Sequence, residues 1–230
     1  MVASLGSRIT TGKLEPGSMI DSDAVASEAN ASRTVVREAF RVLAAKGLIT
    51  SRPHVGTTVR PRSDWRVTDP EVMTWRTAAG VDARLVREVD EVRSAIEPLG
   101  ARLAAQRADD RAIARIREAM AGLRDASDDP GSEVWVDADV RLHRAILQAA
   151  GNELLASLEV LLEPALQARD RVVGAGGDPH QAIALHESVV VAIEHRRTDA
   201  AERAMRRLIA RSAAEAHAAV NPGDRADGTA

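Results

Sequence analysis

Apolar residues along most of this chain recur every three or four positions, which is the period of an amphipathic helix. From residue 70 to residue 218 the pattern is helical nearly throughout, with Gly, Pro or Asp at the breaks and no strand-like alternation. The expected helices cover residues 70–79, 82–107, 110–127, 131–150, 152–173, 178–196 and 198–218. Consecutive helices with short connections predict an antiparallel all-helical bundle.

The first 60 residues follow a different pattern, in which short helices lead into a hairpin. The last of these helices carries Val36, Phe40 and Leu43 at i, i+4 and i+7, so these side chains share its buried face. Two runs rich in β-branched residues follow, at 48–52 and 57–60, with a turn between them. Two helices joined by a tight turn and followed by such a hairpin predict a winged helix-turn-helix.

The two patterns divide the chain and make its fold class mainly α. We expect a winged helix-turn-helix domain over residues 1–62, a polar linker over 63–69 and the helical bundle over 70–218. The tail, residues 219–230, is rich in Gly, Asp and Arg, and we expect it to be disordered.

Composition narrows the classes of protein further. The 230 residues contain no cysteine, which excludes disulfides and thiolate metal sites and fits a reducing, cytoplasmic compartment. We find no leader peptide and no apolar run of about 20 residues, so we expect no membrane role. Residues 1–62 hold 9 Lys and Arg against 5 Asp and Glu, whereas the rest of the chain holds 22 against 29. Such asymmetry is expected if only the first module meets DNA phosphates.

The last short helix of the N-terminal module begins with the residues that would read DNA. Arg33, Thr34, Arg37 and Arg41 lie away from its buried stripe. The first residues of a recognition helix reach base edges in the major groove, where the planar arginine fork can bond to guanine O6 and N7. For any single arginine a solvated helix face is an equally good interpretation, but the arrangement as a whole favours DNA binding.

Four short motifs in this module carry a family resemblance. They are Gly12-x-x-x-Pro16-Gly17, Ser32-Arg33-Thr34-x-Val36-Arg37-Glu38-Ala39, Gly47-Leu48-Ile49 and Gly56-Thr57-x-Val59. With them, residues 5–60 resemble the winged helix-turn-helix of the GntR family of bacterial transcription regulators, although Val35 stands where the family commonly has proline. The resemblance implies base contacts from Arg33, Thr34 and Arg37, phosphate contacts from Arg41 and Arg52, and minor-groove contacts from His54 to Gly56.

The bundle contains a set of residues that suits a metal ion. Asp139 and His143 stand at i and i+4, so they project from one helix face, and His186 on a later helix could converge on the same point. Carboxylate and imidazole both suit zinc, nickel, manganese or iron. A surface ion pair between Asp139 and His143 is the alternative interpretation.

Two arginines of the bundle are candidates for binding an acidic ligand. The guanidinium of Arg93 could hold a carboxylate through two hydrogen bonds, or it could pair with Glu97 on its own helix. Arg169 is a further candidate for the same role.

Further motifs in residues 70–218 extend the resemblance. They are Arg93-x-x-x-Glu97, Asp139-x-x-x-His143, Gly151-Asn152-x-x-Leu155, and His186 ahead of Ala192-Ile193 and Asp199. This region resembles the all-helical effector domain of the FadR-type branch of GntR regulators, called the FCD domain. The stretch Asp69-Pro70-x-Val72-x-x-Trp75 is similar to members that respond to sugar acids.

The FCD resemblance implies a divalent metal, zinc or nickel, held by one aspartate and three histidines. Carried over to this chain, the ligands are Asp139, His143 and His186, and the third histidine should stand where the chain has Leu208. Because leucine cannot ligate, either a three-ligand site remains, completed by water or an effector carboxylate, or metal binding is weak or lost. Some members of this branch use no metal.

Together these observations predict an effector-responsive transcription regulator, and the family resemblance implies a homodimer that is most often a repressor. It would bind a palindromic double-stranded DNA operator and respond to a small organic acid such as a sugar acid. One alternative is a metal-free regulator that responds to an acyl or other apolar ligand. The other is a metal-dependent enzyme, which would need a general base that we do not find and would leave the N-terminal module unexplained. We therefore expect no enzymatic activity.

Overall fold

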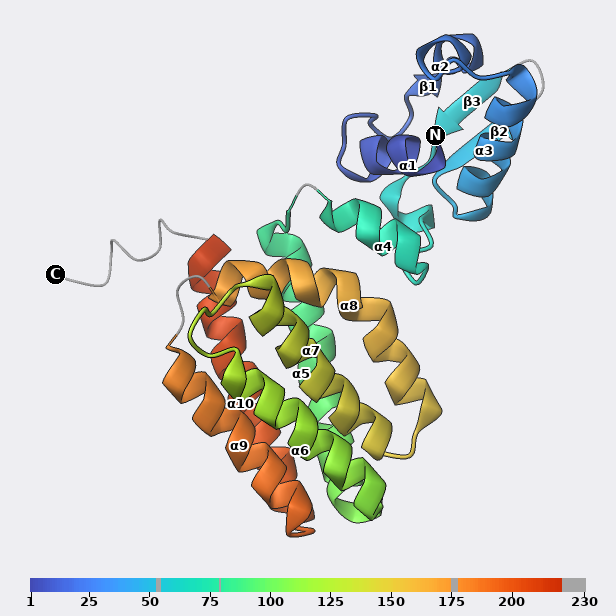
Figure 1. Cartoon of the computed structure of the whole chain (residues 1–230). Helices are drawn as coiled ribbons and strands as arrows, with labels where there is room; N and C mark the ends of the chain where they lie inside the picture. Colours follow the sequence, from blue (N-terminus) through green and yellow to red (C-terminus); the bar gives the residue numbers. More distant parts are fainter. Residues whose placement is uncertain (53–54, 79, 175–177, 221–230) are drawn as a thin grey trace, which may run out of the picture. The chain divides into compact units, whose positions relative to one another are not determined.

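The computed structural model describes residues 1–52, 55–78, 80–174 and 178–220. The chain forms two compact units, Met1–Gly80 and Val81–Ala230, each with a hydrophobic core of its own. The fold is mainly helical, which confirms the predicted class, and the first unit adds a small sheet (Figure 1). None of the described helices is long and apolar enough to cross a membrane.

The N-terminal unit is a winged helix-turn-helix with an added helix. Its helices are α1 (Val2–Thr10), α2 (Ser22–Glu28), α3 (Arg33–Ala45) and α4 (Pro70–Thr77). Its strands are β1 (Met19–Ile20), β2 (Ile49–Arg52) and β3 (Gly56–Val59). The antiparallel sheet has the order β1-β3-β2, with Ile49 opposite Val59, and β2 and β3 form the wing.

Side-chain caps fix where α2 and α3 begin. The Asp21 carboxylate accepts hydrogen bonds from two backbone N–H groups in the first turn of α2, and the Ser32 hydroxyl accepts one in the first turn of α3. The stripe predicted on α3 lies in the core of the unit, with Val36, Phe40 and Leu43 all buried. The caps and the stripe together present the opposite face of α3 to solvent.

Helix α4 packs within the N-terminal unit. Its Trp75 enters the core of that unit and lies directly on Gly6 of α1, where a Cβ atom would overlap the indole ring. The ammonium of Lys46, after the end of α3, lies 2.6 Å from the Asp69 carboxylate and 2.6 Å from that of Glu71. The same ammonium lies 5.6 Å from the centre of the Trp75 ring. These contacts attach α4 to both α1 and α3.

The two units consequently divide at Gly80. The sequence pattern places the boundary near residue 62, with a linker at 63–69 and the bundle from residue 70, so the division in the structure lies further along the chain. The difference arises because long-range contacts, which a local apolar period does not reveal, attach α4 to α1 and to the end of α3.

The C-terminal unit is a bundle of helices, as predicted. They are α5 (Ala83–Arg107), α6 (Asp110–Asp125), α7 (Glu133–Ala149), α8 (Glu153–Gly174), α9 (Pro179–Glu194) and α10 (Thr198–Val220). Helix α10 packs against α5 and α9, and α7 packs against α5, α6 and α8 (Figure 1). Gly100 lets α5 approach α7 closely, since a Cβ atom there would overlap the Leu147 side chain. Most of the tail predicted to be disordered, 221–230, lies outside the described residues.

Candidate functional site

The exposed face of α3 carries the residues predicted to contact DNA. Arg33, Thr34, Arg37 and Arg41 are all exposed there. Arg33 and Arg41 form ion pairs with carboxylates of α2 and α3, at 3.2 and 3.3 Å. Exposed pairs of this kind contribute about 0–1 kcal/mol, so a phosphate or a base edge can replace the carboxylate at little cost.

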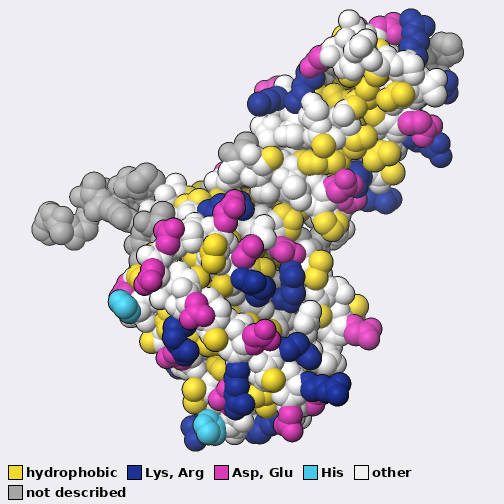
Figure 2. All heavy atoms as spheres, viewed as in Figure 1, with side chains coloured by type: hydrophobic (Ala, Val, Ile, Leu, Met, Phe, Trp, Pro, Cys, Tyr) yellow, Lys and Arg dark blue, Asp and Glu magenta, His cyan; other side chains and the backbone are white. Residues whose placement is uncertain are grey.

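The wing presents two more of the predicted residues. Arg52 is exposed at the end of β2, and Gly56 begins β3 with a φ of 103°, a conformation that favours glycine. His54 lies outside the described residues. Figure 2 shows Lys and Arg side chains interspersed with Asp and Glu side chains over the visible face of the C-terminal unit.

A pocket opens between the helices of the C-terminal unit. Its polar lining consists of Arg93, Asp139, His143, Asp170, Asp178, His186, Arg211, Ser212 and Glu215. Its apolar lining consists of Pro130, Trp135, Pro179, Ala182, Leu185 and Leu208. The three predicted metal ligands therefore lie in one pocket, together with one of the two predicted acid-binding arginines.

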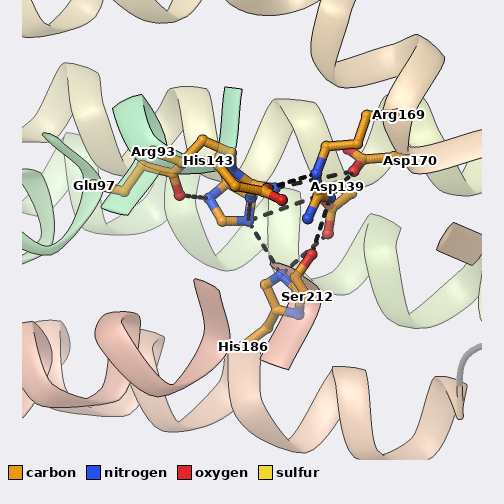
Figure 3. A network of polar contacts seen from close by, with 9 residues as sticks. Arg93, Glu97, Asp139, His143, Arg169, Asp170, His186 and Ser212 are labelled. Atoms are coloured by element: carbon orange, nitrogen blue, oxygen red, sulfur yellow. Dashed lines mark hydrogen bonds and ion pairs between the residues drawn. The ribbon is translucent and has the colours of Figure 1, made fainter. Parts of the chain in front are cut away.

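Asp139, His143 and His186 converge at one point in this pocket. Each offers one ligand atom, and these atoms all lie within 4.8 Å of one another. The Nε2 atoms of the two histidines are 3.3 Å apart. Asp139 Oδ1 lies 3.0 Å from His186 Nε2, and its Oδ2 lies 3.7 Å from His143 Nε2 (Figure 3). Because the partly buried carboxylate of Asp139 faces two buried imidazoles, Asp139 and His143 do not form an isolated surface ion pair.

Both imidazoles have their remote nitrogen next to an acceptor. His143 Nδ1 lies 2.6 Å from Glu97 Oε2, and His186 Nδ1 lies 2.8 Å from the backbone oxygen of Ala182. Acceptors in these positions favour protonation at Nδ1, which leaves the Nε2 lone pairs facing the cluster. Metal-binding histidines are usually oriented in this way by the groups behind them.

The electrostatics of the cluster favour a positive charge between its carboxylates. Burial lowers the pKa of His143, but Glu97 and Asp139 outweigh burial and raise this pKa above its ordinary value. Burial likewise raises the pKa of Asp139, but His143 and His186 outweigh it and lower that pKa. A bound cation would be stabilised by the same carboxylates.

Leu208 lines the same pocket from α10 and is only 4% exposed. Its side chain offers no ligand atom, so the group that could hold an ion in the described part of the chain consists of one carboxylate and two imidazoles. This donor set fits zinc or nickel, and three protein ligands leave a coordination position open for another molecule.

Arg93 forms the pair with Glu97 that its place in the sequence suggests as one of two roles. Its Nε lies 2.7 Å from Glu97 Oε1 on the same helix, and the pair is buried rather than on the surface. Its Nη2 lies 3.5 Å from His143 Nε2. Its Nη1 has no hydrogen-bond acceptor among the described residues, although Asp170 lies 4.0 Å away. The guanidinium therefore faces the pocket with one nitrogen unsatisfied.

The charges of this pair are maintained in spite of burial. Burial raises the pKa of Glu97, but Arg93 and His143 outweigh it and lower the pKa to about 2. Burial lowers the pKa of Arg93, but Glu97 and Asp170 outweigh it and raise that pKa. The pocket thus presents a permanently charged guanidinium to a ligand.

Arg169 lies behind the pocket wall and is not among the residues that line it. It is 1% exposed, and it donates hydrogen bonds to Asp90 and Asp170 at 2.7 Å each and to Ser212 Oγ at 3.0 Å (Figure 3). Arg169 can therefore orient Asp170 and Ser212, which do line the pocket, but it does not itself face a ligand there.

Several residues in the pocket lining, and one behind it, were not expected from the sequence. Asp90 and Asp170 stand in helical segments without a motif, so only the fold reveals that they meet Arg169. The α10 residues Arg211, Ser212 and Glu215 follow Leu208 at helical spacing. Because the resemblance places a metal ligand at the position of Leu208, the same helix face leads to these three residues.

A winged helix-turn-helix unit joined to a helical unit with a pocket lined by charged and apolar side chains defines a class of two-domain transcription regulators. Within that class, the chain belongs to the gntR family of bacterial regulatory proteins: the family profile matches residues 1–59, and that of the FCD domain matches residues 88–211. Both resemblances found in the sequence are thereby confirmed.

Known relatives resemble the chain over most of its length. The galactonate operon transcriptional repressor of Escherichia coli K12 is 34% identical over 215 residues, which cover 92% of this chain and 93% of that protein. LutR, a transcriptional regulator of Bacillus subtilis, is 31% identical over 151 residues, which cover 65% of this chain and 66% of LutR.

A solved structure supports the fold. Lar, which controls the expression of the Listeria monocytogenes agr system, gives a TM-score of 0.67 at 16% identity, with 94% of this chain and 95% of that chain covered. Because its family and these relatives are transcription regulators and not enzymes, the chain is assigned as a transcription regulator, as the sequence predicted.

Proposed function

We propose that this regulator is a repressor controlled by a small organic acid of the sugar-acid type, held in the pocket of the C-terminal unit. The observation that carries the proposal is the buried Arg93 guanidinium, whose Nη1 is unsatisfied beside the cluster of Asp139, His143 and His186. A carboxylate would satisfy both this guanidinium and an open metal position. The galactonate operon repressor supports the choice of a sugar acid as effector and of repression as the response.

The proposed metal, zinc or nickel, would be held by Asp139, His143 and His186. When bound, it supplies a positive charge and open positions for oxygen ligands of the effector. Leu208 leaves the site one ligand short of the family pattern, so the effector carboxylate would complete it. Metal and acid should consequently each increase the affinity of the chain for the other.

The proposed DNA complex contains two copies of the chain on the two halves of a palindromic operator. A symmetric dimer in the cytoplasm is the simplest arrangement that places two recognition helices in successive major grooves. The residues assigned to bases are Arg33, Thr34 and Arg37, those assigned to phosphates are Arg41 and Arg52, and those assigned to the minor groove are His54 to Gly56. Light scattering of the full chain, with and without DNA, measures the number of copies.

Thermal melting of the chelator-treated full chain tests the effector class. Sugar acids and short 2-hydroxy acids are added alone and after nickel or zinc. A ligand at a hundred times its Kd stabilises the native state by about 2.7 kcal/mol, so binding raises the Tm measurably. We expect an acid to raise the Tm more in the metal-loaded chain, and Asp139→Asn to abolish that difference. If no acid changes the Tm in either form, the proposed effector class is wrong.

A metal-free regulator of an apolar ligand is the second candidate. It is favoured by the apolar wall that Trp135, Leu185 and Leu208 give to the pocket. A medium-chain acid such as octanoate would then raise the Tm equally with and without metal, while sugar acids would have no effect.

A further inference from the structure

Helix α10 presents a second group of polar side chains to the pocket. Arg211, Ser212 and Glu215 stand three, four and seven positions after Leu208, so all four share one helix face, and all line the pocket. An α-helix rises 1.5 Å per residue, which places Glu215 about 10 Å beyond Leu208 along the axis. Ser212 is already engaged by Arg169 at 3.0 Å, which leaves Arg211 and Glu215 as the pair to explain (Figure 3).

The Arg211–Glu215 ion pair leaves hydrogen-bonding capacity unused. Both Nε and Nη2 of Arg211 lie against the same oxygen, Glu215 Oε1, at 2.8 and 2.7 Å. The second carboxylate oxygen and the remaining guanidinium N–H groups take no part in this pair. The pair therefore offers a donor and an acceptor side by side at the pocket.

Burial distinguishes this pair from its surface counterparts. The Arg211 and Glu215 side chains are 31% and 27% exposed. Arg84 and Glu88, which form a pair at the same i, i+4 spacing on α5, are 63% and 38% exposed. A pair that has lost more of its water gains more from a polar ligand than a more exposed pair does.

Alcohol groups match what this pair presents. A hydroxyl donates one hydrogen bond and accepts others, so two neighbouring hydroxyls can accept from the guanidinium and donate to the carboxylate at once. A hydrocarbon chain can do neither and would leave the pair without partners. Trp135 and Leu185, in the same pocket, offer apolar surface to the C–H groups of either ligand.

The geometry points to Arg211 and Glu215 as the residues that select a polyhydroxylated acid by binding hydroxyls of its carbon chain. This inference rests on the proposed function, because it assumes that the carboxylate of the same ligand lies at Arg93. It assigns the two ends of the ligand to different helices, with the acid group on α5 and the hydroxyls on α10.

Calorimetric titration of the nickel-loaded full chain tests this assignment with three acids. Galactonate carries hydroxyls along a six-carbon chain, 2-hydroxyhexanoate has the same length and head group without them, and glycolate is the head group alone. We expect the wild-type chain to bind galactonate more tightly than 2-hydroxyhexanoate. We expect Arg211→Met and Glu215→Gln each to weaken galactonate about tenfold and to leave the other two acids within about twofold. Arg84→Met is the matched control and should change none of the three affinities.

The other outcomes are equally decisive. Unchanged galactonate affinity in both pocket variants, or an equal loss for all three acids, would overturn the assignment, because the pair would then be structural or act only through its charge. Wild-type binding of glycolate and 2-hydroxyhexanoate that equals that of galactonate would also overturn it, while the acid effector itself would stand. If the wild-type chain binds none of the three, and gluconate no better, the proposed acid effector is wrong and this inference fails with it. The Tm of each variant is measured in the same experiment and compared with that of the wild-type chain, as a control for folding.

Discussion

At the scale of single residues, the structural role of Arg93 and its proposed binding role can be separated. Arg93→Met leaves the Glu97 carboxylate buried beside His143 without its guanidinium, and breaking a buried pair in this way costs about 3–5 kcal/mol. Adding Glu97→Gln removes the orphaned charge and should recover part of the lost stability. Acid binding should remain absent in both variants, since neither has the guanidinium.

Urea unfolding and calorimetric titration of the single and double variants measure the two roles of Arg93 separately. Recovery of acid affinity in the double variant would show that Arg93 serves stability alone, and that another group binds the acid.

Leu208 allows a gain of function to be predicted as well. Leu208→His would add an imidazole to the pocket from α10, at the position where the FCD resemblance implies a fourth ligand. One ligand accounts for roughly a quarter of the binding free energy of a four-ligand zinc site, so the affinity should rise by about a hundredfold. Competition with a chelator of known affinity measures the change, and Leu185→His, at another apolar position of the same pocket, is the control. An unchanged affinity would place Leu208 out of reach of the ion.

The candidate site illustrates which residue contacts a sequence can predict. Asp139 and His143 are separated by one helical turn, so their proximity follows from local geometry alone. The convergence of His186 was only a possibility from the predicted antiparallel bundle, because the residue is distant in sequence, and the resemblance to a family made it specific. Arg169 was a weaker candidate for binding the acid than Arg93, and its guanidinium donates hydrogen bonds to Asp170 and to the distant Asp90, a pairing that has no local signal in the sequence.

At the scale of secondary-structure elements, the attachment of α4 depends on a pH-sensitive contact. Burial raises the pKa of Asp69, but the Lys46 ammonium outweighs it, so this pKa lies below its ordinary value of 3.8. The contact therefore stabilises the fold at pH above about 3.8, and the contribution is lost as pH falls through the lower pKa of the folded state.

We expect Asp69→Asn to lower the free energy of unfolding by about 1 kcal/mol at pH 7 and to have little effect near pH 2. Asparagine still caps α4, so Asp69→Ala should cost about 1 kcal/mol more, because alanine cannot cap the helix. Urea unfolding followed by tryptophan fluorescence suits this measurement, because Trp65 and Trp75 lie in the core concerned. If Asp69→Asn lowered the free energy of unfolding equally at pH 7 and pH 2, the charge of Asp69 would not contribute to stability.

The elements themselves were largely predictable, whereas their grouping was not. Caps such as Ser32 and Asp178 and the three-to-four residue period locate helices because both act within one or two turns. The period of α4 looks like that of the bundle helices. Its membership of the N-terminal unit depends on a glycine about seventy positions before Trp75, where the absence of a side chain makes room for an indole.

At the scale of the whole molecule, DNA recognition should be separable from the integrity of the bundle. Arg33→Ala combined with Arg37→Ala removes two exposed guanidinium groups from α3 and should abolish sequence preference, because each arginine that reads a base contributes about 1–3 kcal/mol. The Tm should hardly change, since both side chains are exposed. A duplex selected from a random library by the wild-type chain serves as the probe in a gel-shift titration.

The control removes the same charge from the other unit. Arg117 and Arg124 lie on α6, and both side chains are exposed. The double variant Arg117→Ala with Arg124→Ala should therefore leave specific DNA binding intact. If the α3 variant kept its preference for the selected duplex, the assignment of α3 as the recognition helix would be wrong.

The packing of Trp75 on Gly6 also limits how such regulators can be recombined. A chimera that joins this DNA-binding unit to the effector domain of a relative must carry the graft after Gly80 and not near residue 62. If the unit ended at residue 62, it would lack Trp75. The apolar surface of α1 around Gly6 would then be exposed to solvent, which would favour aggregation. Joined after Gly80, it would carry its own complete core into any new partner.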